Sequence, residues 1–315
     1  MNEHDRDERY PLDLAPTGVA TFYKAPLVER FEGLHGAIAV LGVPHDLGVG
    51  YRPGARFGPR AVREASTRLG PLGEEGYFDV EQGRRLLQGR RLIDAGDVDA
   101  LRSRPAATLE AVERTVASLA AAGAFPVVIG GDHSGTGPAV RALARQQPLG
   151  VLQIDAHLDF TDTVAGSPDT SSSPLRRASE APGVTRVLQV GIRGARTDEA
   201  AYRDAVASGN LVLGRAQWRD PQARRRLLDA LGELDRCYVT LDMDAFDPAV
   251  APGVSSPEPG GFDYPEVRQL LQEAASATRI VGFDVMEVNP MVDHSGATAY
   301  LAAVAALELL GAIFG

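Results

Sequence analysis

The sequence predicts an α/β protein, built as a three-layer α/β/α sandwich around a central, mostly parallel sheet of eight strands. Eight short, near-continuous apolar runs rich in β-branched residues alternate with Ala- and Arg-rich segments of helical period. Such runs are typical of parallel strands that helices cover on both faces. No internal repeat or long linker interrupts the alternation, so we expect a single domain over residues 36–315.

The elements follow in chain order. Residues 1–35 are polar and punctuated by proline, and we expect them to form an N-terminal arm. The predicted strands are 37–43, 91–96, 125–131, 149–155, 186–192, 211–214, 237–242 and 279–285. The predicted helices are 58–69, 106–122, 135–147, 198–208, 221–232, 264–277 and 297–313. Pro265 stands near the start of the helix at 264–277, where proline is favoured.

Composition narrows the class of protein. A net charge of −10 argues against a nucleic-acid partner, because such proteins need a basic surface. The single cysteine, Cys237, excludes an internal disulfide and fits a reducing compartment. The charged start "MNEHDRDERYPLDLAP" lacks the apolar core of a signal peptide, and no run approaches the roughly 18 apolar residues of a membrane span. We therefore expect a soluble, cytoplasmic protein with no membrane partner.

Three predicted strands end in side chains that bind metals. They follow "FPVVIGGD", "VLQI" and "YVTL", and they are His133, Asp155, His157, Asp159, Asp242 and Asp244. Side chains two apart on an extended segment point the same way, and parallel strands gather their carboxyl ends at one edge of the sheet. Four carboxylates brought together there would repel one another by several kcal/mol unless cations lay among them. Mixed His/Asp donors suit manganese and also zinc, iron, cobalt or nickel, and six of them are enough for two ions.

The segments that carry these residues resemble the signature segments of the ureohydrolases, the family of arginase, agmatinase and the guanidino-acid amidinohydrolases. They are "GGDHS", "DAHLD" and "LDMDAFDPAVAPGVSSPEPGG", and the likeness extends to residues 51–66, 94–99 and 281–299. The forms "ARFGPRAVR" and "PEPGG" are more similar to the agmatinase branch than to true arginases. The resemblance covers nearly all of the chain after the predicted arm, and it implies the arginase-like fold.

The resemblance also implies a pair of Mn²⁺ ions, with Ni²⁺ or Co²⁺ as alternatives. One ion would be held by His133, Asp155, Asp159 and Asp242, and the other by His157, Asp155, Asp242 and Asp244. Glu287, in "DVMEVNP", matches the glutamate that binds the guanidinium, a planar cation that a carboxylate orients through a forked pair of hydrogen bonds. Asp159 is the residue expected to move a proton to the leaving amine. The implied reaction is hydrolysis of a guanidino group to urea and an amine.

One segment departs from the family pattern. Many ureohydrolases carry a histidine in a "HGTPFRRA"-like segment at the mouth of the pocket, where it contacts substrate or transfers a proton. This chain has "SSSPLRRA" at residues 171–178, so Ser171 or a near neighbour takes its place. Serine cannot hold a proton reversibly near neutral pH as imidazole does. Because this histidine is missing, the chain could also be a non-catalytic subunit related to the ureohydrolases, which is an alternative to an active enzyme.

The substrate that the resemblance implies is a small guanidino cation, and the sequence favours agmatine, which would yield putrescine. An amidinohydrolase of a guanidino acid such as 4-guanidinobutyrate is the alternative. Arg176 and Arg177 would support the acid if they pointed into the pocket. The resemblance further implies a homo-oligomer, a trimer or a hexamer.

Overall fold

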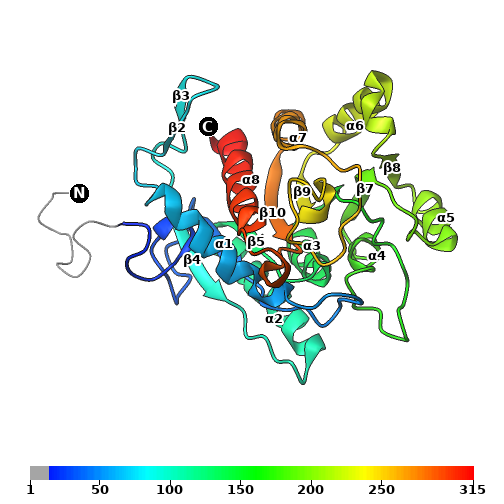
Figure 1. Ribbon diagram of the computed structural model, residues 1–315, viewed down its shortest axis with the longest axis horizontal. Helices are drawn as coiled ribbons and strands as arrows, with labels where there is room; N and C mark the ends of the chain where they lie inside the picture. The colour runs from blue at the N-terminus through cyan, green and yellow to red at the C-terminus, as the bar shows by residue number, and fades with distance from the viewer. Residues whose placement is uncertain (1–13) are drawn as a thin grey trace, which may run out of the picture.

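A computed structural model describes residues 14–315 and contains the predicted sheet (Figure 1). All neighbouring strands of the eight-stranded sheet are parallel, and their order is β4-β1-β5-β10-β9-β6-β7-β8. The strands are β1 (Ile38–Gly42), β4 (Leu92–Asp97), β5 (Phe125–Ile129), β6 (Leu149–Ile154), β7 (Val184–Ile192), β8 (Leu211–Gly214), β9 (Cys237–Asp242) and β10 (Ile280–Met286). Each predicted strand has its counterpart, and the predicted fold class is confirmed.

Helices cover both faces of the sheet and make the outer layers of the sandwich. One face is covered by α1 (Gly58–Ser66), α6 (Pro221–Gly232), α7 (Tyr264–Ala277) and α8 (Ala297–Phe314). The other face is covered by α2 (Pro105–Ala121), α3 (Thr136–Ala144), α4 (Pro174–Ser179) and α5 (Glu199–Ala207). Alternate residues of β1 enter the two cores, Ile38 and Val40 on one face and Ala39 and Leu41 on the other, as the period of a strand requires.

Two elements have no counterpart among the predicted ones. The short α4 lies in the segment after the "DAHLD" cluster, and the antiparallel hairpin of β2 (Tyr77–Asp79) and β3 (Arg84–Leu86) lies outside the main sheet. Its strands of three residues are too short to show a periodic pattern. The hairpin packs Tyr77 and Leu86 so close to Gly311 of α8 that a Cβ there would clash with both.

The expectation that no apolar run approaches the length of a membrane span is wrong for α8. Within residues 14–315, this one helix is long and apolar enough to cross a membrane by length and composition. It packs between α1 and α7 as a core helix. Its Glu308 accepts hydrogen bonds from Tyr264 and Arg268 of α7, at 2.9 Å each.

The predicted arm spans residues 1–35, and residues 1–13 lie outside the described part of the chain. Further on, Phe22 and Tyr23 are fully buried in the same core as the sheet. The backbone N–H of Phe22 donates to Asp94 at 2.9 Å, and the Tyr23 hydroxyl donates to the carbonyl of Ala303 in α8 at 2.9 Å.

The order of the strands decides where the candidate site lies. Strands β5, β10, β9 and β6 are consecutive neighbours in the middle of the sheet. They carry, just past their carboxyl ends, every side chain that the sequence marks as a metal ligand, together with Glu287. Side chains from four strand ends, from His133 to Glu287, thus converge on one edge of the sheet although they are far apart in sequence.

Candidate active site

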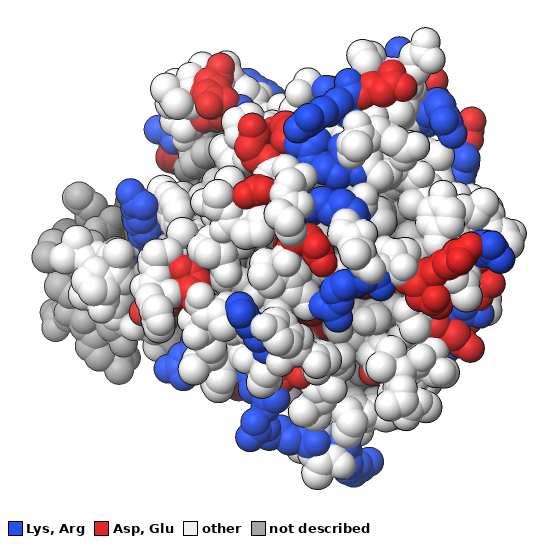
Figure 2. Space-filling model, turned by 45° about the vertical axis from the view of Figure 1, so that its right-hand side comes forward, with Lys and Arg blue, Asp and Glu red and all other residues white. Residues whose placement is uncertain are grey.

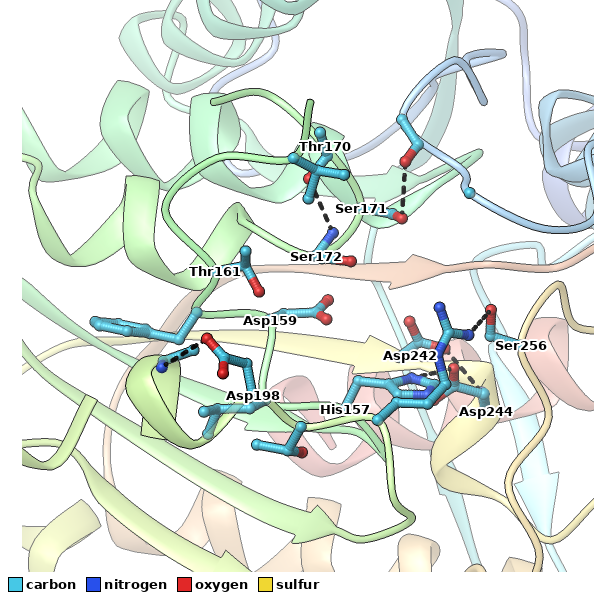
Figure 3. Close-up of a pocket in the computed structure, with 18 of the residues that line it drawn as sticks. His157, Asp159, Thr161, Thr170, Ser171, Ser172, Asp198, Asp242, Asp244 and Ser256 are labelled. Carbon is cyan, nitrogen blue, oxygen red and sulfur yellow. Dashed lines mark hydrogen bonds and ion pairs between the residues drawn. The ribbon is translucent and has the colours of Figure 1, made fainter. Parts of the chain in front are cut away.

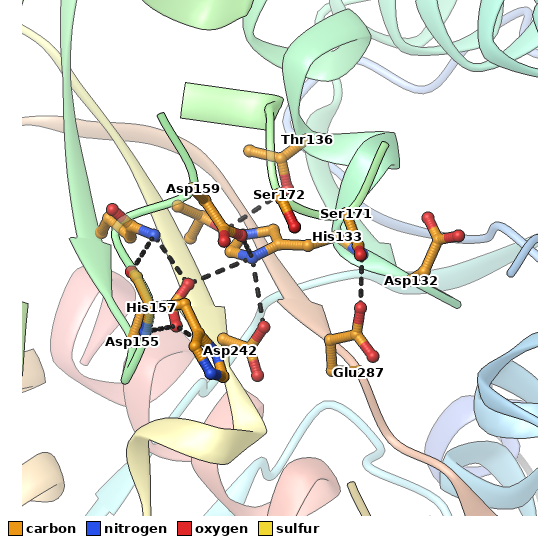
Figure 4. A network of polar contacts seen from close by, with 12 residues as sticks. Asp132, His133, Thr136, Asp155, His157, Asp159, Ser171, Ser172, Asp242 and Glu287 are labelled. Atoms are coloured by element: carbon orange, nitrogen blue, oxygen red, sulfur yellow. Dashed lines mark hydrogen bonds and ion pairs between the residues drawn. The ribbon is translucent and has the colours of Figure 1, made fainter. Parts of the chain in front are cut away.

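The first half of the site is centred on His133, which follows β5 and is completely buried. Its Nδ1 atom lies 3.2 Å from Asp155 Oδ2, 2.9 Å from Asp159 Oδ2 and 3.1 Å from Asp242 Oδ2 (Figure 4). This nitrogen has no hydrogen-bond partner of acceptable geometry. Three carboxylate oxygens therefore surround one imidazole nitrogen as ligands surround an ion.

The second half is centred on His157. Its Nδ1 atom lies 2.9 Å from Asp244 Oδ2 and 3.8 Å from Asp155 Oδ1. Ligand atoms of Asp155, His157 and Asp244 lie within 4.8 Å of one another, and so do those of His133, Asp155 and Asp242. Asp155 belongs to both groups, so the two halves share a carboxylate.

Backbone N–H groups hold the strand-end acids in place. Asp155 Oδ1 accepts from the N–H of His157 at 2.6 Å, and Asp242 Oδ1 accepts from the N–H of Asp244 at 2.8 Å. Asp244 Oδ1 in turn accepts from the N–H of Ala156 at 3.2 Å, which joins the turn after β6 to the turn after β9. One oxygen of each carboxylate is thereby fixed, and the site geometry is set before any ligand binds.

A further layer of polar groups orients the ligand side chains. Thr240 Oγ1 lies 2.8 Å from His133 Nε2, the ring nitrogen that faces away from the acids. Gln153 Nε2 donates to Asp155 Oδ2 at 2.6 Å, and Gln189 Nε2 donates to Gln153 Oε1 at 2.6 Å. Partners of this kind fix the ring and carboxylate orientations at metal centres.

The pKa values of the clustered acids and of His157 show that negative charge is concentrated in the site. Burial, with the charges of Asp244 and Asp159, raises the pKa of Asp155 to about 7. Burial and the same crowding raise the pKa of Asp242 well above its usual range. Burial disfavours a charged His157, yet the carboxylates around it, Asp244 foremost, raise its pKa to about 11. Repulsion among desolvated carboxylates is the cause, and cations among them remove it.

The side chains gathered at the site are suited to bind a pair of divalent cations. The set combines two imidazole nitrogens with four carboxylates, and His133 Nδ1 is a buried nitrogen without a hydrogen-bond partner, which a bound cation would supply. Asp155 belongs to both groups of ligands. The six ligands predicted from the sequence are all brought together here. Which ion each residue holds stays a prediction.

Glu287 follows β10, which lies between β5, the strand before His133, and β9, the strand that ends in Asp242. Its Oε1 accepts from the backbone N–H of His133 at 2.9 Å, and the residue lines the pocket above the acids. Burial and the neighbouring Asp132 raise the pKa of Glu287 to about 8. A buried carboxylate with one oxygen held and no cation beside it is suited to receive a positively charged group.

The pocket over the cluster has a volume of about 170 Å³ (Figure 3). This is below the roughly 300–1,000 Å³ of pockets for drug-sized ligands, so it suits a compact substrate. Its walls come from the loops after β1, β6, β7 and β9, and they include Gly48, Thr161, Thr170, Ser171, Ser172, Arg196, Thr197, Asp198 and Ser256.

Ser171 lies in this wall, as the sequence predicts for the residue in place of the pocket histidine. Its hydroxyl donates to the carbonyl of Gly48 at 3.0 Å, and its N–H donates to the same oxygen at 3.2 Å. Ser171 thus joins the loop after β6 to the loop after β1. Arg176 and Arg177, which were candidates for the pocket, instead form ion pairs with Asp162, Glu180 and Asp204 on the surface.

Sequence reasoning missed the wall residues contributed by the loop after β7, Arg196 among them. The signal was present, because "RVLQVGI" was predicted as a strand and the residues after it belong at the same edge of the sheet. That loop contains no metal-type cluster, so only the order of the strands, with β7 beside β6, reveals that it reaches the pocket.

Fold and site together define an α/β protein with a His/Asp centre of metal-binding type at the carboxyl edge of its sheet. Residues 36–311 match the Arginase family, and the chain belongs to this family of hydrolases. The family's enzymes are binuclear metal hydrolases, in keeping with the two groups of ligands.

Three relatives with different names are similar to this chain over nearly its whole length. The chain is 34% identical to the mitochondrial guanidino acid hydrolase of Homo sapiens, over 95% of this chain and 84% of the relative. It is 32% identical to an agmatinase of Bacillus anthracis, over 95% of this chain and 98% of the relative. The solved structure of proclavaminate amidino hydrolase from Streptomyces clavuligerus matches with a TM-score of 0.82 and 31% identity, covering 95% of this chain and 98% of that one.

Proposed function

We propose that the protein hydrolyses the guanidino group of a small substrate to urea and an amine, with two Mn²⁺ ions as the cofactor. A guanidinium R–NH–C(NH2)2⁺ and one water give urea and R–NH3⁺, so the C–N bond to R–NH breaks and the water oxygen becomes the urea carbonyl. The relatives named above bear this chemistry in their names, and they differ in the rest of the substrate.

One observation supports the proposal above the others. The cluster of the six residues predicted to bind divalent cations lies beside a separate, buried carboxylate, Glu287, on the neighbouring strand end. The ligands explain how water would be activated, and Glu287 explains why the molecule attacked would be a cation. When bound, a pair of divalent ions supplies Lewis-acid activation of a water and electrostatic stabilisation of the developing charge.

The chain's own residues supply positioning and proton transfer. Glu287 Oε2, with Oε1 held by the N–H of His133, accepts hydrogen bonds from the guanidinium and turns its carbon toward the acids. Asp159 lines the pocket at the face of the cluster, where its carboxylate takes the proton of the attacking water and passes it to the leaving nitrogen. Ser171 and the loop after β1 form part of the pocket wall.

The proposal is tested by measuring urea release from a panel of guanidino compounds, each with the protein reconstituted in turn with Mn²⁺, Ni²⁺ and Co²⁺. Agmatine, 4-guanidinobutyrate and arginine cover the tails of different charge. We expect urea from at least one compound, and the absence of urea from all of them contradicts the proposal. The trimeric or hexameric assembly and the cytoplasmic location stay predictions.

The variant Glu287→Gln tests the role of the carboxylate within that reaction. Gln keeps the size of the side chain and an acceptor for the His133 N–H, but it lacks the charge that pairs with the guanidinium. We expect kcat/KM to fall about 100-fold or more, because hydrogen bonds to charged groups carry most of the orientation. Bound metal, measured by elemental analysis, should stay at the wild-type stoichiometry. Glu233→Gln, an exposed residue, is the control. Near-wild-type kcat/KM in Glu287→Gln would exclude the assigned role.

A further inference from the structure

The charges that line the pocket fall into an inner and an outer set. The inner set holds the acids of the cluster and Glu287. Four aspartates balance the charge of two divalent cations, and Glu287 balances a guanidinium, so the inner set is neutral once both are bound. The charge that selects the rest of the substrate must therefore come from the outer set.

Arg196 is the only Lys or Arg among the described residues that line the pocket. Its guanidinium donates a hydrogen bond to the neutral hydroxyl of Ser256 at 3.2 Å and forms no ion pair within residues 14–315. This separates it from Arg176 and Arg177, whose charges are taken up by surface acids. Figure 3 shows Ser256 on the side of the pocket next to Asp244 and His157. The guanidinium of Arg196, which is bonded to Ser256, therefore lies in the pocket wall close to the cluster of acids.

The acid of the outer set, Asp198, is already engaged. It is the N-cap of α5, and its two carboxylate oxygens face the N–H groups of Ala200 and Ala201, at 3.4 Å each. The start of a helix carries a partial positive charge that favours such an acid. Asp198 is therefore less available than Arg196 to a charged group on a substrate.

We propose that the substrate is an ω-guanidino carboxylic acid, and that Arg196, with the Ser256 hydroxyl beside it, binds the carboxylate. This inference rests on the proposed function. A carboxylate matches the planar donor face of a guanidinium through two parallel hydrogen bonds. The ammonium group of agmatine, which the sequence favoured, would instead meet the same charge as its own. Arg196 is thus a specificity-determining residue.

The test compares kcat/KM for a series of ω-guanidino acids of increasing length with kcat/KM for agmatine and for butylguanidine, whose tail is uncharged. The proteins are the Mn²⁺-loaded wild type, Arg196→Lys and Arg196→Glu. We expect the wild type to prefer the best acid over agmatine by about tenfold or more, since a partly exposed charged hydrogen bond is worth about that ratio. Arg196→Lys keeps the charge but not the forked pair of hydrogen bonds, so it should keep a smaller preference for the acid, and Arg196→Glu should reverse the preference.

Arg203→Glu is the matched control, because it makes the same change in charge on α5, outside the pocket, at an exposed residue. It should leave the ratio of acid to agmatine as in the wild type. A wild type that prefers agmatine, or a ratio that Arg196→Glu does not change, overturns the assignment of Arg196 while urea release still supports the proposed function. No urea from any compound overturns the proposed function itself.

Discussion

Glu287 and Asp159 share a backbone conformation that side chains rarely adopt. Their φ angles are 65° and 52°, in the left-handed region, which costs about 1–2 kcal/mol for a residue with a Cβ. Strain of this kind persists where the surrounding structure fixes it, and it gathers at functional sites. The two acids expected to contact the substrate are thus aimed by strained turns at the ends of β10 and β6.

Sequence motifs identified these acids but could not show their conformation. The pattern "DAHLD" predicts side chains that point the same way along an extended segment. The side chains of Asp155 and His157 do lie close together, but the strand ends at Ile154 and the backbone bends, with the His157 N–H bonded to the Asp155 carboxylate. Asp159 reaches His133 only because the chain turns at a positive φ after leaving the strand. The residue types and their spacing could therefore be predicted from the sequence. The turn at Asp159 could not, because it depends on contacts with His133 after β5 and with Leu175 of α4, whose N–H donates to the Asp159 carbonyl.

The raised pKa of Glu287 predicts a pH dependence of stability in protein stripped of metal. The folded-state pKa is about 8 and the ordinary value is 4.5, so between these values the folded protein holds a proton that the unfolded chain has lost. The stability of the stripped protein should therefore fall as pH rises through this window. Glu287→Gln removes one titrating group, and its melting temperature should decline less steeply between pH 5 and pH 8, as calorimetry would measure. Parallel curves for the two proteins would contradict the shift.

Thr240 offers a test of how the ring of His133 is held. Its hydroxyl lies 2.8 Å from Nε2, and Val has nearly the same shape without the oxygen. We expect Thr240→Val to weaken metal binding about 10- to 100-fold, the range seen when partners of ligating histidines are removed. Competition with a chelator of known affinity gives the dissociation constant. Thr240→Ser keeps a hydroxyl and should bind metal nearly as the wild type does, and equal losses in both variants would argue against the hydrogen bond.

At the scale of elements, the strand ends were predictable and their order was not. Eight apolar runs located the strands, and the rule that parallel strands gather their carboxyl ends at one edge placed the six ligands together. The insertion of β10 between β5 and β9 brings Glu287 beside the cluster, although 154 residues separate it from His133. Packing across the whole sheet decides that order, and no local pattern encodes it.

The loop after β1 forms a wall of the pocket only because a glycine lets it come close. A Cβ at Gly48 would stand 2.8 Å from the N atom of Ser171 and 3.0 Å from Asp132 Oδ2, whereas a Cβ at Gly50 would meet nothing within 4 Å. Both glycines line the pocket. We expect Gly48→Ala to push the two loops apart and raise KM several-fold, with a smaller effect on kcat. Gly50→Ala is the matched control and should behave as the wild type in steady-state kinetics, and the same KM in both variants would contradict this reading.

At the scale of the whole molecule, charge is organised differently on the surface and at the site. The face in Figure 2 shows basic and acidic side chains close together. Surface pairs such as Arg186 with Glu233 at 2.7 Å and Arg176 with Asp204 at 2.8 Å join neighbouring elements. The cluster under the pocket is instead an accumulation of acids around two histidines, and no Lys or Arg of the described residues forms an ion pair with these acids. Many surface charges therefore have partners within the chain, whereas the carboxylates of the site lack Lys or Arg partners, which favours cations bound among them.

Metal removal should consequently lower the stability of the entire domain, since the ligands join the ends of β5, β6 and β9 in the middle of the sheet. A ligand present at 1,000 times its dissociation constant stabilises the folded state by about 4 kcal/mol, which corresponds to roughly 6 °C for a domain of this size. We expect chelation to lower the melting temperature of the wild type by about that amount, and Mn²⁺ to restore it. Asp155→Ala loses the shared ligand and should melt at the same temperature with and without Mn²⁺, whereas Asp235→Ala, an exposed acid away from the site, should respond as the wild type does. A wild type whose melting temperature ignores both chelator and Mn²⁺ would mean that the acids are stabilised without ions, and the repulsion that raises their pKa values would need another explanation.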